Sequence, residues 1–228
     1  VQTGLFLPKF IHHSSPVFSV HFHPNQPVLI TGDAEGYVKI WNIYKRELVT
    51  SFRPHVRYIF SMAFNAAGTE LITSSWDGII KHWTVSKDFT EVSLIDAIDF
   101  KNNTGFTVGF SPHDLYLAVG DVDKSFRLFE LDTKEEVNKF IGHSKTVSDF
   151  RFFQSAGRQL VATVSRDGWL KIWDFNTGTL IRKFSTPRKT PMLSIDYIPK
   201  TNHLVLGNAD RSIYLYDVNS FKIDFQFK

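Results

Sequence analysis

An all-β fold of repeated four-stranded sheets is predicted from three features of the sequence. A seven-residue ending recurs five times and closes on an aromatic residue at positions 41, 83, 129, 173 and 216. These positions are 42, 46, 44 and 43 residues apart, a spacing that indicates an array of equivalent units. Aromatic residues make up 15% of the chain, and they favour pleated, half-buried strands.

Each ending is predicted to be a tight turn followed by a strand. The turn opens with an acidic residue, and the residues after it alternate in character until the aromatic is reached. The five endings are Glu35 to Trp41, Asp77 to Trp83, Asp123 to Phe129, Asp167 to Trp173 and Asp210 to Tyr216. Three further apolar runs accompany each ending, and linkers rich in turn-forming residues separate them.

Four short strands in a unit of about 43 residues predict the blade of a β-propeller. Residues 1–228 then form a single propeller region of five blades. The predicted repeat boundaries are about 12–53, 54–95, 96–141, 142–184 and 185–228. Leu5 to Ile11 has the pattern of an outer strand, so we expect it to belong to a further blade whose other strands precede Val1.

The repeat is similar to that of the WD-repeat family over essentially the whole chain. In that family a His before the inner strand, a Ser or Thr on the second strand, the turn Asp and the aromatic on the third strand form a buried tetrad. The resemblance implies complete tetrads in repeats two and four, made of His55, Thr73, Asp77 and Trp83, and of His143, Thr163, Asp167 and Trp173. It also implies a complete propeller of seven blades, with a closed five-bladed ring as the alternative.

Repeat one departs from the tetrad pattern at its acid. It has His13, Thr31 and Trp41, but Glu35 stands where the turn Asp is expected. With Glu35 as the acid, the His-to-acid spacing is 22 residues in repeats one and two and 24 in repeat four. We expect the longer carboxylate to alter the network of this repeat.

Repeats three and five lack most of the tetrad. Repeat three keeps Asp123 but has Lys101 and Val119 at the other polar positions. Repeat five keeps Asp210 but has Arg188 and Leu206 there. We therefore expect these two blades to be held together mainly by apolar packing.

The residues predict no enzymatic chemistry. Cys is absent, which removes disulfides, thiolate metal sites and cysteine nucleophiles. The tetrads resemble a nucleophile, base and acid set, but a constellation that recurs in several blades indicates a structural role. His12, His13, His21 and His23 have no matching acid or Cys for a metal, and no Gly-rich phosphate loop is present. We predict no catalytic residue, no cofactor and no metal.

The resemblance implies that partners bind the top face, where loops of successive blades converge around the central channel. Loops on a rigid scaffold commonly carry binding residues. In the family, partners often contact the residue before the turn acid and the residue five beyond the His. Carried over to this sequence and extended by two neighbours, the predicted partner-binding residues are Trp76, Arg166, Phe60, Phe18, Phe106, Arg57 and Tyr58. The remaining equivalent positions hold Ala34, Val122, Ala209, Ser148 and Leu193.

We expect this patch to suit an acidic or apolar peptide, because Trp and Arg are enriched at binding hot spots. The alternative is that Trp76 only packs on a neighbouring loop. The favoured function is a non-enzymatic scaffold that presents protein- or peptide-binding surfaces within a multi-subunit complex.

The charge balance bears on a second hypothesis. The chain has 26 Lys and Arg against 23 Asp and Glu, a net charge of +3, so nucleic acid is not predicted to be the main ligand. Basic residues nonetheless interleave with aromatics, as on stacking platforms. The alternative is therefore a subunit of an RNA- or chromatin-associated assembly that contacts nucleic acid directly through basic blade rims. No apolar run approaches the roughly 20 residues that cross a bilayer, so we expect no membrane insertion and an intracellular location, with the nucleus slightly preferred over the cytoplasm.

Overall fold

The computed structural model describes residues 12–100 and 105–227. Within these ranges the chain forms twenty strands, arranged in five antiparallel four-stranded sheets, and one short 3-10 helix. The predicted leading strand Leu5 to Ile11 and the predicted polar position Lys101 lie outside the described residues.

Each sheet is one blade, and its four strands follow one another along the chain. Blade 1 contains β1 (Val17–Phe22), β2 (Val28–Asp33), β3 (Val38–Asn42) and β4 (Glu47–Phe52), and blade 2 contains β5 (Ile59–Phe64), β6 (Glu70–Ser75), β7 (Ile79–Val85) and β8 (Val92–Asp99). Blade 3 contains β9 (Gly105–Phe110), η1 (Pro112–Asp114), β10 (Tyr116–Asp121), β11 (Ser125–Glu130) and β12 (Glu136–Ile141). Blade 4 contains β13 (Val147–Ser155), β14 (Arg158–Ser165), β15 (Trp169–Asp174) and β16 (Leu180–Ser185), and blade 5 contains β17 (Met192–Ile198), β18 (His203–Asn208), β19 (Ile213–Asp217) and β20 (Lys222–Phe227).

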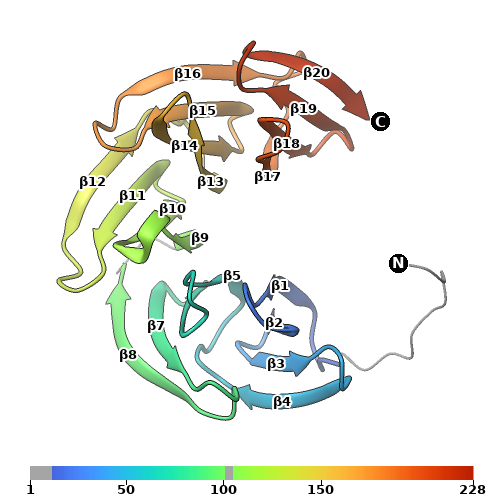
Figure 1. The fold of residues 1–228 in the computed structure, drawn as a ribbon, viewed down its shortest axis with the longest axis vertical. Helices are drawn as coiled ribbons and strands as arrows, with labels where there is room; N and C mark the ends of the chain where they lie inside the picture. Colours follow the sequence, from blue (N-terminus) through green and yellow to red (C-terminus); the bar gives the residue numbers. More distant parts are fainter. Residues whose placement is uncertain (1–11, 101–104, 228) are drawn as a thin grey trace.

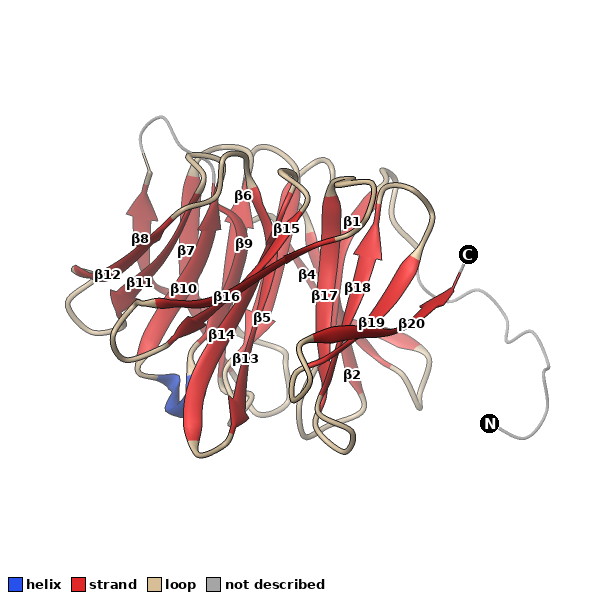
Figure 2. Ribbon diagram, turned by 90° about the horizontal axis from the view of Figure 1, so that it is seen from above, coloured by secondary structure: helices blue, strands red, loops and turns tan. Residues whose placement is uncertain are grey.

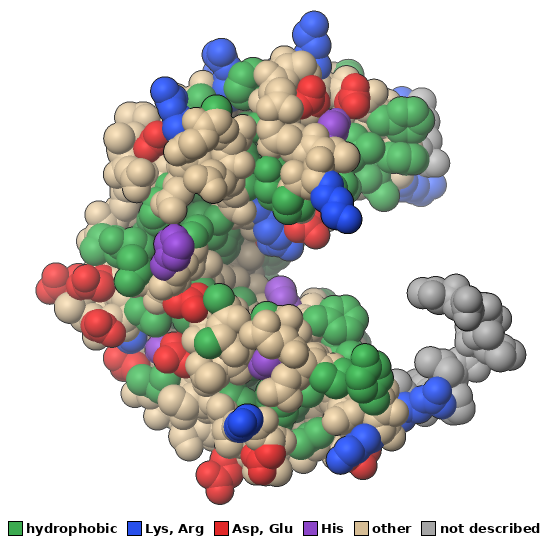
Figure 3. Space-filling model, in the orientation of Figure 1, with side chains coloured by type: hydrophobic (Ala, Val, Ile, Leu, Met, Phe, Trp, Pro, Cys, Tyr) green, Lys and Arg blue, Asp and Glu red, His purple; other side chains and the backbone are tan. Residues whose placement is uncertain are grey.

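The five blades lie in an open arc (Figure 1), and residues of their inner strands line a central channel. The first strand of each blade lines the channel, and the fourth strand lies at the outer edge. The space-filling view shows the same opening between blade 5 and blade 1 (Figure 3). The predicted all-β propeller with five blades in this chain is confirmed. The total of seven blades stays a prediction, and β8 runs to Asp99, beyond the repeat boundary expected at residue 95.

The hydrophobic core lies between blades rather than within them. Side chains alternate across each strand, so a blade presents one apolar face to each neighbour. Between blades 1 and 2, for example, Ile30 and Ile40 pack against Met62, Leu71 and Trp83. Corresponding clusters lie between each later pair of neighbouring blades. A single blade would leave both of these faces in water, so each blade depends on its neighbours for stability.

A β-bulge near the start of every inner strand turns one side chain toward the channel. The strand register shifts by one residue at this place in β1, β5, β9, β13 and β17. A bulge leaves its extra residue unpaired and re-aims the side chain. The bulged residues are Phe18, Phe60, Phe106, Ser148 and Leu193, and all five line the channel.

The loops that join the first and second strands of the blades lie on the face of the propeller that carries η1, at the lower edge of Figure 2. In the first of these loops, His23 links blade 1 to blade 2. Its Nε2 donates to the Gly68 carbonyl at 3.0 Å, and its Nδ1 accepts the Asn25 amide at 3.1 Å. The ring also packs edge-on against Phe64. His21, by contrast, lines the channel, so these two neighbouring histidines have separate surroundings. None of the helical segments in the described part of the chain is long and apolar enough to cross a membrane.

The glycine of the β2–β3 turn allows the next loop to lie directly against it. Gly36 has a φ of +86°, and a Cβ there would overlap the His55 carbonyl. Gly157, in the β13–β14 turn, has a φ of +74° but open space around it. Because left-handed backbone costs a non-Gly residue about 1–2 kcal/mol, Gly157→Ala should lose about that much stability and Gly36→Ala at least twice as much. Urea unfolding of the two variants measures the difference, and equal losses would contradict the seating of the loop on the turn.

Candidate functional site

A buried hydrogen-bond network ties the loop before the inner strand to the turn of the same blade. In blade 2, His55 Nδ1 lies 2.9 Å from Asp77 Oδ2, and its Nε2 lies 2.8 Å from Thr73 Oγ1. The Trp83 indole N–H donates to the same hydroxyl at 3.1 Å. If the hydroxyl donates to the imidazole and the imidazole to the carboxylate, every group has a partner, and the His is neutral with its proton on Nδ1.

Blade 4 carries the same network with nearly the same lengths. His143 lies 3.0 Å from Asp167 and 2.9 Å from Thr163, and the Trp173 indole donates to Thr163 at 2.9 Å. The structure therefore brings together the four residues expected in each of repeats two and four.

In blade 1 the acid of the network is Asp33, so the prediction of Glu35 is wrong. His13 lies 2.8 Å from Asp33 Oδ2 and 2.6 Å from Thr31 Oγ1, and the Trp41 indole donates to Thr31 at 2.8 Å. Asp33 ends β2, two residues before the position at which the other networks have their acid. Its second oxygen accepts the Glu35 amide at 3.0 Å. The carboxylate therefore reaches the histidine from the strand end while also closing the turn, and the His-to-acid spacing is 20 residues rather than 22.

A lysine two residues before the tryptophan belongs to each of the three networks, and the sequence analysis missed it. Lys81 Nζ donates to the Pro54 carbonyl at 2.6 Å and lies 5.8 Å from the centre of the Trp83 ring. Lys39 and Lys171 make the corresponding bonds to the carbonyls of the residues before His13 and His143. The signal was present as a Lys-x-Trp triplet in repeats one, two and four.

Blade 3 replaces the network with ion pairs. Arg127 stands at the position of these lysines and binds the turn carboxylate of Asp123, and its Nη1 lies 3.2 Å from Glu136 Oε2. Lys139 Nζ is 3.7 Å from the same Asp123 carboxylate. The expectation that apolar packing mainly holds this blade therefore leaves out a charged cluster. In blade 5, Gln226 instead links Ser212 and Tyr214, at 3.1 and 3.0 Å.

The geometry of the three networks suits structure and not catalysis. A nucleophile must be reachable by its substrate, yet Thr73 and Thr163 are 0% exposed and Thr31 is 2% exposed. Burial by itself would raise the pKa of Asp167, but hydrogen bonds from His143 and from the Ser144 amide outweigh it and lower the pKa to about 2. The carboxylate is therefore ionised and fully occupied at neutral pH.

The channel mouth carries a continuous series of ring contacts. Starting in blade 1, Phe18 lies 5.3 Å from Tyr58, and Tyr58 lies 6.4 Å from Trp76, measured between ring centres. Phe60 lies 5.3 Å from Trp76 and 4.8 Å from Phe106. The Arg166 guanidinium of blade 4 ends the series, 5.3 Å from the Phe106 ring centre. We call these six residues the mouth cluster.

Three of the five rings of the mouth cluster are about half exposed to water, and Phe60 and Phe106 are partly buried. Phe18 is 53% exposed, Trp76 is 52% exposed and Tyr58 is 43% exposed. Trp76 does pack on the loop before β5, because its amide donates to the Tyr58 carbonyl at 3.0 Å, but half of its surface stays free. Arg57 is exposed next to Tyr58 and takes no part in the ring contacts. The structure thus gathers six of the seven residues predicted for partner binding.

The mouth cluster lines a channel cavity of about 560 Å³, whose wall also carries charged side chains that the sequence analysis missed. Arg151 lies 3.0 Å from Asp149 and 3.1 Å from Asp196, which joins blades 4 and 5. Burial and the nearby Arg151 lower the pKa of His21 to about 4, so this imidazole is neutral at physiological pH. Strand alternation from the bulge could have placed Asp149 and Arg151 on one side of β13.

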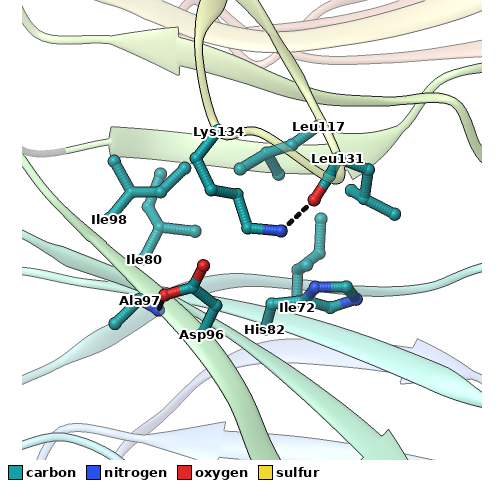
Figure 4. A pocket seen from close by; sticks show the side chains of 9 residues that line it. All are labelled: Ile72, Ile80, His82, Asp96, Ala97, Ile98, Leu117, Leu131 and Lys134. Atoms are coloured by element: carbon teal, nitrogen blue, oxygen red, sulfur yellow. Dashed lines mark hydrogen bonds between the residues drawn. The ribbon is translucent and has the colours of Figure 1, made fainter.

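A second cavity, between blades 2 and 3, is too small for a ligand (Figure 4). Its volume is about 10 Å³, which holds one water molecule at most. Lys134 extends over it and donates to the Leu131 carbonyl, while His82 and Asp96 lie at its edge. The candidate site is therefore the channel mouth.

Comparison with known proteins agrees with this architecture. The family described as "WD domain, G-beta repeat" matches residues 4–42, 46–84 and 134–174, which together exceed half of the chain. The chain belongs to the WD-repeat family. The predicted family is therefore confirmed.

Three relatives illustrate what this WD-repeat chain is similar to. It is 32% identical over 124 residues to the U3 small nucleolar RNA-associated protein 21 homolog of Schizosaccharomyces pombe, covering 54% of this chain and 13% of that protein. It is 34% identical over 130 residues to pre-mRNA-processing factor 17 of Homo sapiens, covering 53% of this chain and 22% of that protein. It is 26% identical over 221 residues to the WD repeat-containing protein 55 homolog of Dictyostelium discoideum, covering 94% of this chain and 51% of that protein. The chain thus spans about half of the third relative and much less of the first two.

The role of Asp33 in place of Glu35 can be tested by paired substitutions. Asp33→Ala should lower the free energy of unfolding by roughly 1 to 3 kcal/mol, because it leaves His13 without its buried acceptor. Glu35→Ala should change it by less than about 0.5 kcal/mol, as at an ordinary surface position. Chemical denaturation of both variants measures this, and the reverse ranking would restore Glu35 to the network.

Asp121 in blade 3 provides a test by pH. It stands at the position of Asp33, but its Oδ2 is buried and receives no hydrogen bond from the described part of the chain. Burial and repulsion by Asp123 raise its pKa to about 6, although the Arg127 guanidinium, 3.7 Å from its Oδ2, acts in the opposite direction. A carboxyl whose pKa is raised by folding weakens the fold when it ionises, so the penalty grows from about pH 4 to about pH 6.

Asp121→Asn should therefore raise the melting temperature by several degrees at pH 7.5 and leave it unchanged near pH 4. Differential scanning calorimetry at both pH values measures the effect, with the exposed Asp132→Asn as a charge-matched control. A variant that melts no higher than the wild type at pH 7.5 would show that the ionised carboxyl carries no penalty.

Proposed function

We propose that this chain is a non-enzymatic scaffold within a multi-subunit complex and that its mouth cluster binds a peptide segment of a partner protein. The observation that carries the proposal is the series of ring contacts that three successive blades form at one opening, in which Phe18, Tyr58 and Trp76 are about half exposed. Contiguous exposed apolar patches on soluble proteins commonly mark interaction sites. The bulged inner strands hold Phe18 and Phe60 in place, and Trp76 in the β6–β7 turn packs against Phe60, so little entropy is lost when a partner binds.

The chemistry of the mouth cluster favours a peptide with an apolar or aromatic side chain next to an acidic one. The rings of Phe18, Trp76 and Phe60 supply the apolar contact area. Arg166 lies at one edge of this area, over Phe106. Arg57 is exposed next to Tyr58. A carboxylate on the peptide could pair with either guanidinium once its neighbour packs against the rings.

The second candidate function is that of a subunit of an RNA-associated assembly, which would specify the kind of complex that the scaffold belongs to. The names of two relatives, a U3 small nucleolar RNA-associated protein and a pre-mRNA-processing factor, support it. A nuclear location would follow from such a role. The test is whether partners purified with the natural full-length protein include RNA, and whether nuclease treatment releases them.

The proposed peptide site is tested with Trp76→Ala in the natural full-length protein. Trp76 is half exposed, so its removal should leave the melting temperature unchanged, while a partner held at the mouth should be recovered at least about tenfold less. Affinity purification with quantitative mass spectrometry measures the recovery. Tyr44→Ala is the matched control, because Tyr44 is 83% exposed in the β3–β4 turn, away from the mouth cluster.

If Trp76→Ala retains every partner, or if Tyr44→Ala loses the same ones, the mouth cluster is not the binding site. Loss of one partner by Trp76→Ala alone, with both variants folded, supports it.

A further inference from the structure

The positive charge of the chain is concentrated in blade 4 and the loop that follows it. Residues 142–191 contain nine Lys and Arg but only three Asp, an excess of six, although the whole chain carries only +3. Two of the three acids are occupied, since Asp149 pairs with Arg151 and Asp167 bonds His143. The basic residues of this segment are Lys145, Arg151, Arg158, Arg166, Lys171, Arg182, Lys183, Arg188 and Lys189.

Two of these cations lie over one tryptophan, at the end of blade 4 that is on the same face as the mouth cluster. Trp169 begins β15, directly after the β14–β15 turn, and is partly exposed. The ammonium groups of Lys183 and Lys189 lie 5.2 and 5.7 Å from its ring centre. The β16–β17 loop sits on the turn, because a Cβ at Gly168 would come within 2.6 Å of the Lys189 carbonyl oxygen.

The exposed cations beside Trp169 have no acidic partner in the described part of the chain. Lys183, Arg188 and Lys189 are exposed, and within residues 12–100 and 105–227 none of them forms an ion pair. Lys171, directly opposite Lys183 in the sheet, has its pKa lowered mainly by burial and to a smaller extent by the charge of Lys183. In blade 3, by contrast, Arg127 is paired with carboxylates of its own blade.

The basic surface continues inward from Trp169. The Lys145 carbonyl accepts the Ser165 hydroxyl at 3.0 Å, and the Arg166 amide donates to the Thr146 carbonyl at 3.1 Å. The loop before β13 therefore lies beside the β14–β15 turn, which places Lys145 between the outer rim and the channel mouth. Cations thus follow one another across the end of blade 4, with an aromatic ring at the outer end.

We propose that this end of blade 4 binds single-stranded nucleic acid, with Lys183, Lys189 and Lys145 on the phosphates and the Trp169 ring as a stacking surface. Unpaired cations beside an aromatic ring match the alternation of phosphate and base along a single strand. An acidic peptide would use the cations but would leave the ring without a role. Trp169 does not line the channel, so this site is separate from the mouth cluster and does not depend on peptide binding there.

The test measures binding of the folded chain to a fluorescein-labelled 12-nucleotide oligouridine by anisotropy across a range of salt concentrations. Lys183→Glu with Lys189→Glu should weaken binding by at least about tenfold and reduce the slope of log K against log salt by about 1.4, two phosphate contacts being lost. Lys45→Glu with Lys87→Glu makes the same change of charge at exposed lysines of blades 1 and 2 and should have a much smaller effect. Equal losses in the two double variants would mean that only net charge matters, and would overturn the proposal.

The role of the ring is tested with two substitutions that keep an apolar side chain. Trp169→Phe should retain most of the affinity, and Trp169→Leu should lose several-fold, because only the former can stack. Equal affinities would remove Trp169 from the site. Melting curves check that each variant is folded, and the comparison of Phe with Leu does not require the more drastic Ala variant.

The nature of the ligand is decided by competition. A 12-residue polyglutamate peptide should displace the oligouridine only at far higher concentration, and an RNA duplex of the same length should bind more weakly because its bases are already stacked. Displacement by polyglutamate at an equal concentration would assign the surface to acidic peptides instead and overturn the proposal.

Discussion

In the three blades that carry it, the bond between the loop histidine and a carboxylate of its own blade fixes where the inner strand begins, and the rest of the blade depends on that position. The loop arrives from the outer strand of one blade and enters the inner strand of the next. In blade 2, His55 fixes that loop to the turn through Asp77 and to the second strand through Thr73. The inner strand begins four residues later, at Ile59, so its start is held in place. The apolar faces of adjacent blades can then meet in register.

The same attachment positions the candidate site. A bulge follows directly at the start of the inner strand, and its extra residue points into the channel. Phe60 follows His55 in this way, and Phe18 follows His13. The same bulge recurs in every blade and points one side chain into the channel. Which residue stands at the bulge then sets the chemistry of the mouth. Blade 4 has Ser148 there, which leaves the cationic side of the mouth to Arg166.

The blades differ most where the network is missing. Blade 3 has Asp121 where blade 1 has Asp33, but Asp121 meets repulsion from Asp123 in place of a histidine. Its turn is held instead by Arg127, at the position that blades 1, 2 and 4 give to a lysine. Blade 4 keeps the whole network and in addition gathers unpaired lysines around Trp169. The identical scaffold therefore carries an aromatic surface over blades 1 to 3 and a basic surface over blade 4.

The sequence by itself determined the number of blades in the chain, the strands of each and two complete networks, because these follow from local patterns that recur at a fixed interval. It could not decide between Asp33 and Glu35, since both lie near the turn and only the backbone geometry shows which carboxylate faces His13. Nor could it show that Lys81 bonds the Pro54 carbonyl across 27 residues, or that Lys183 and Lys189 meet at one ring. Such contacts join loops and strands whose separation in the chain carries no periodic signal. Tertiary packing alone decides them, because it sets which side chains lie within reach of one another.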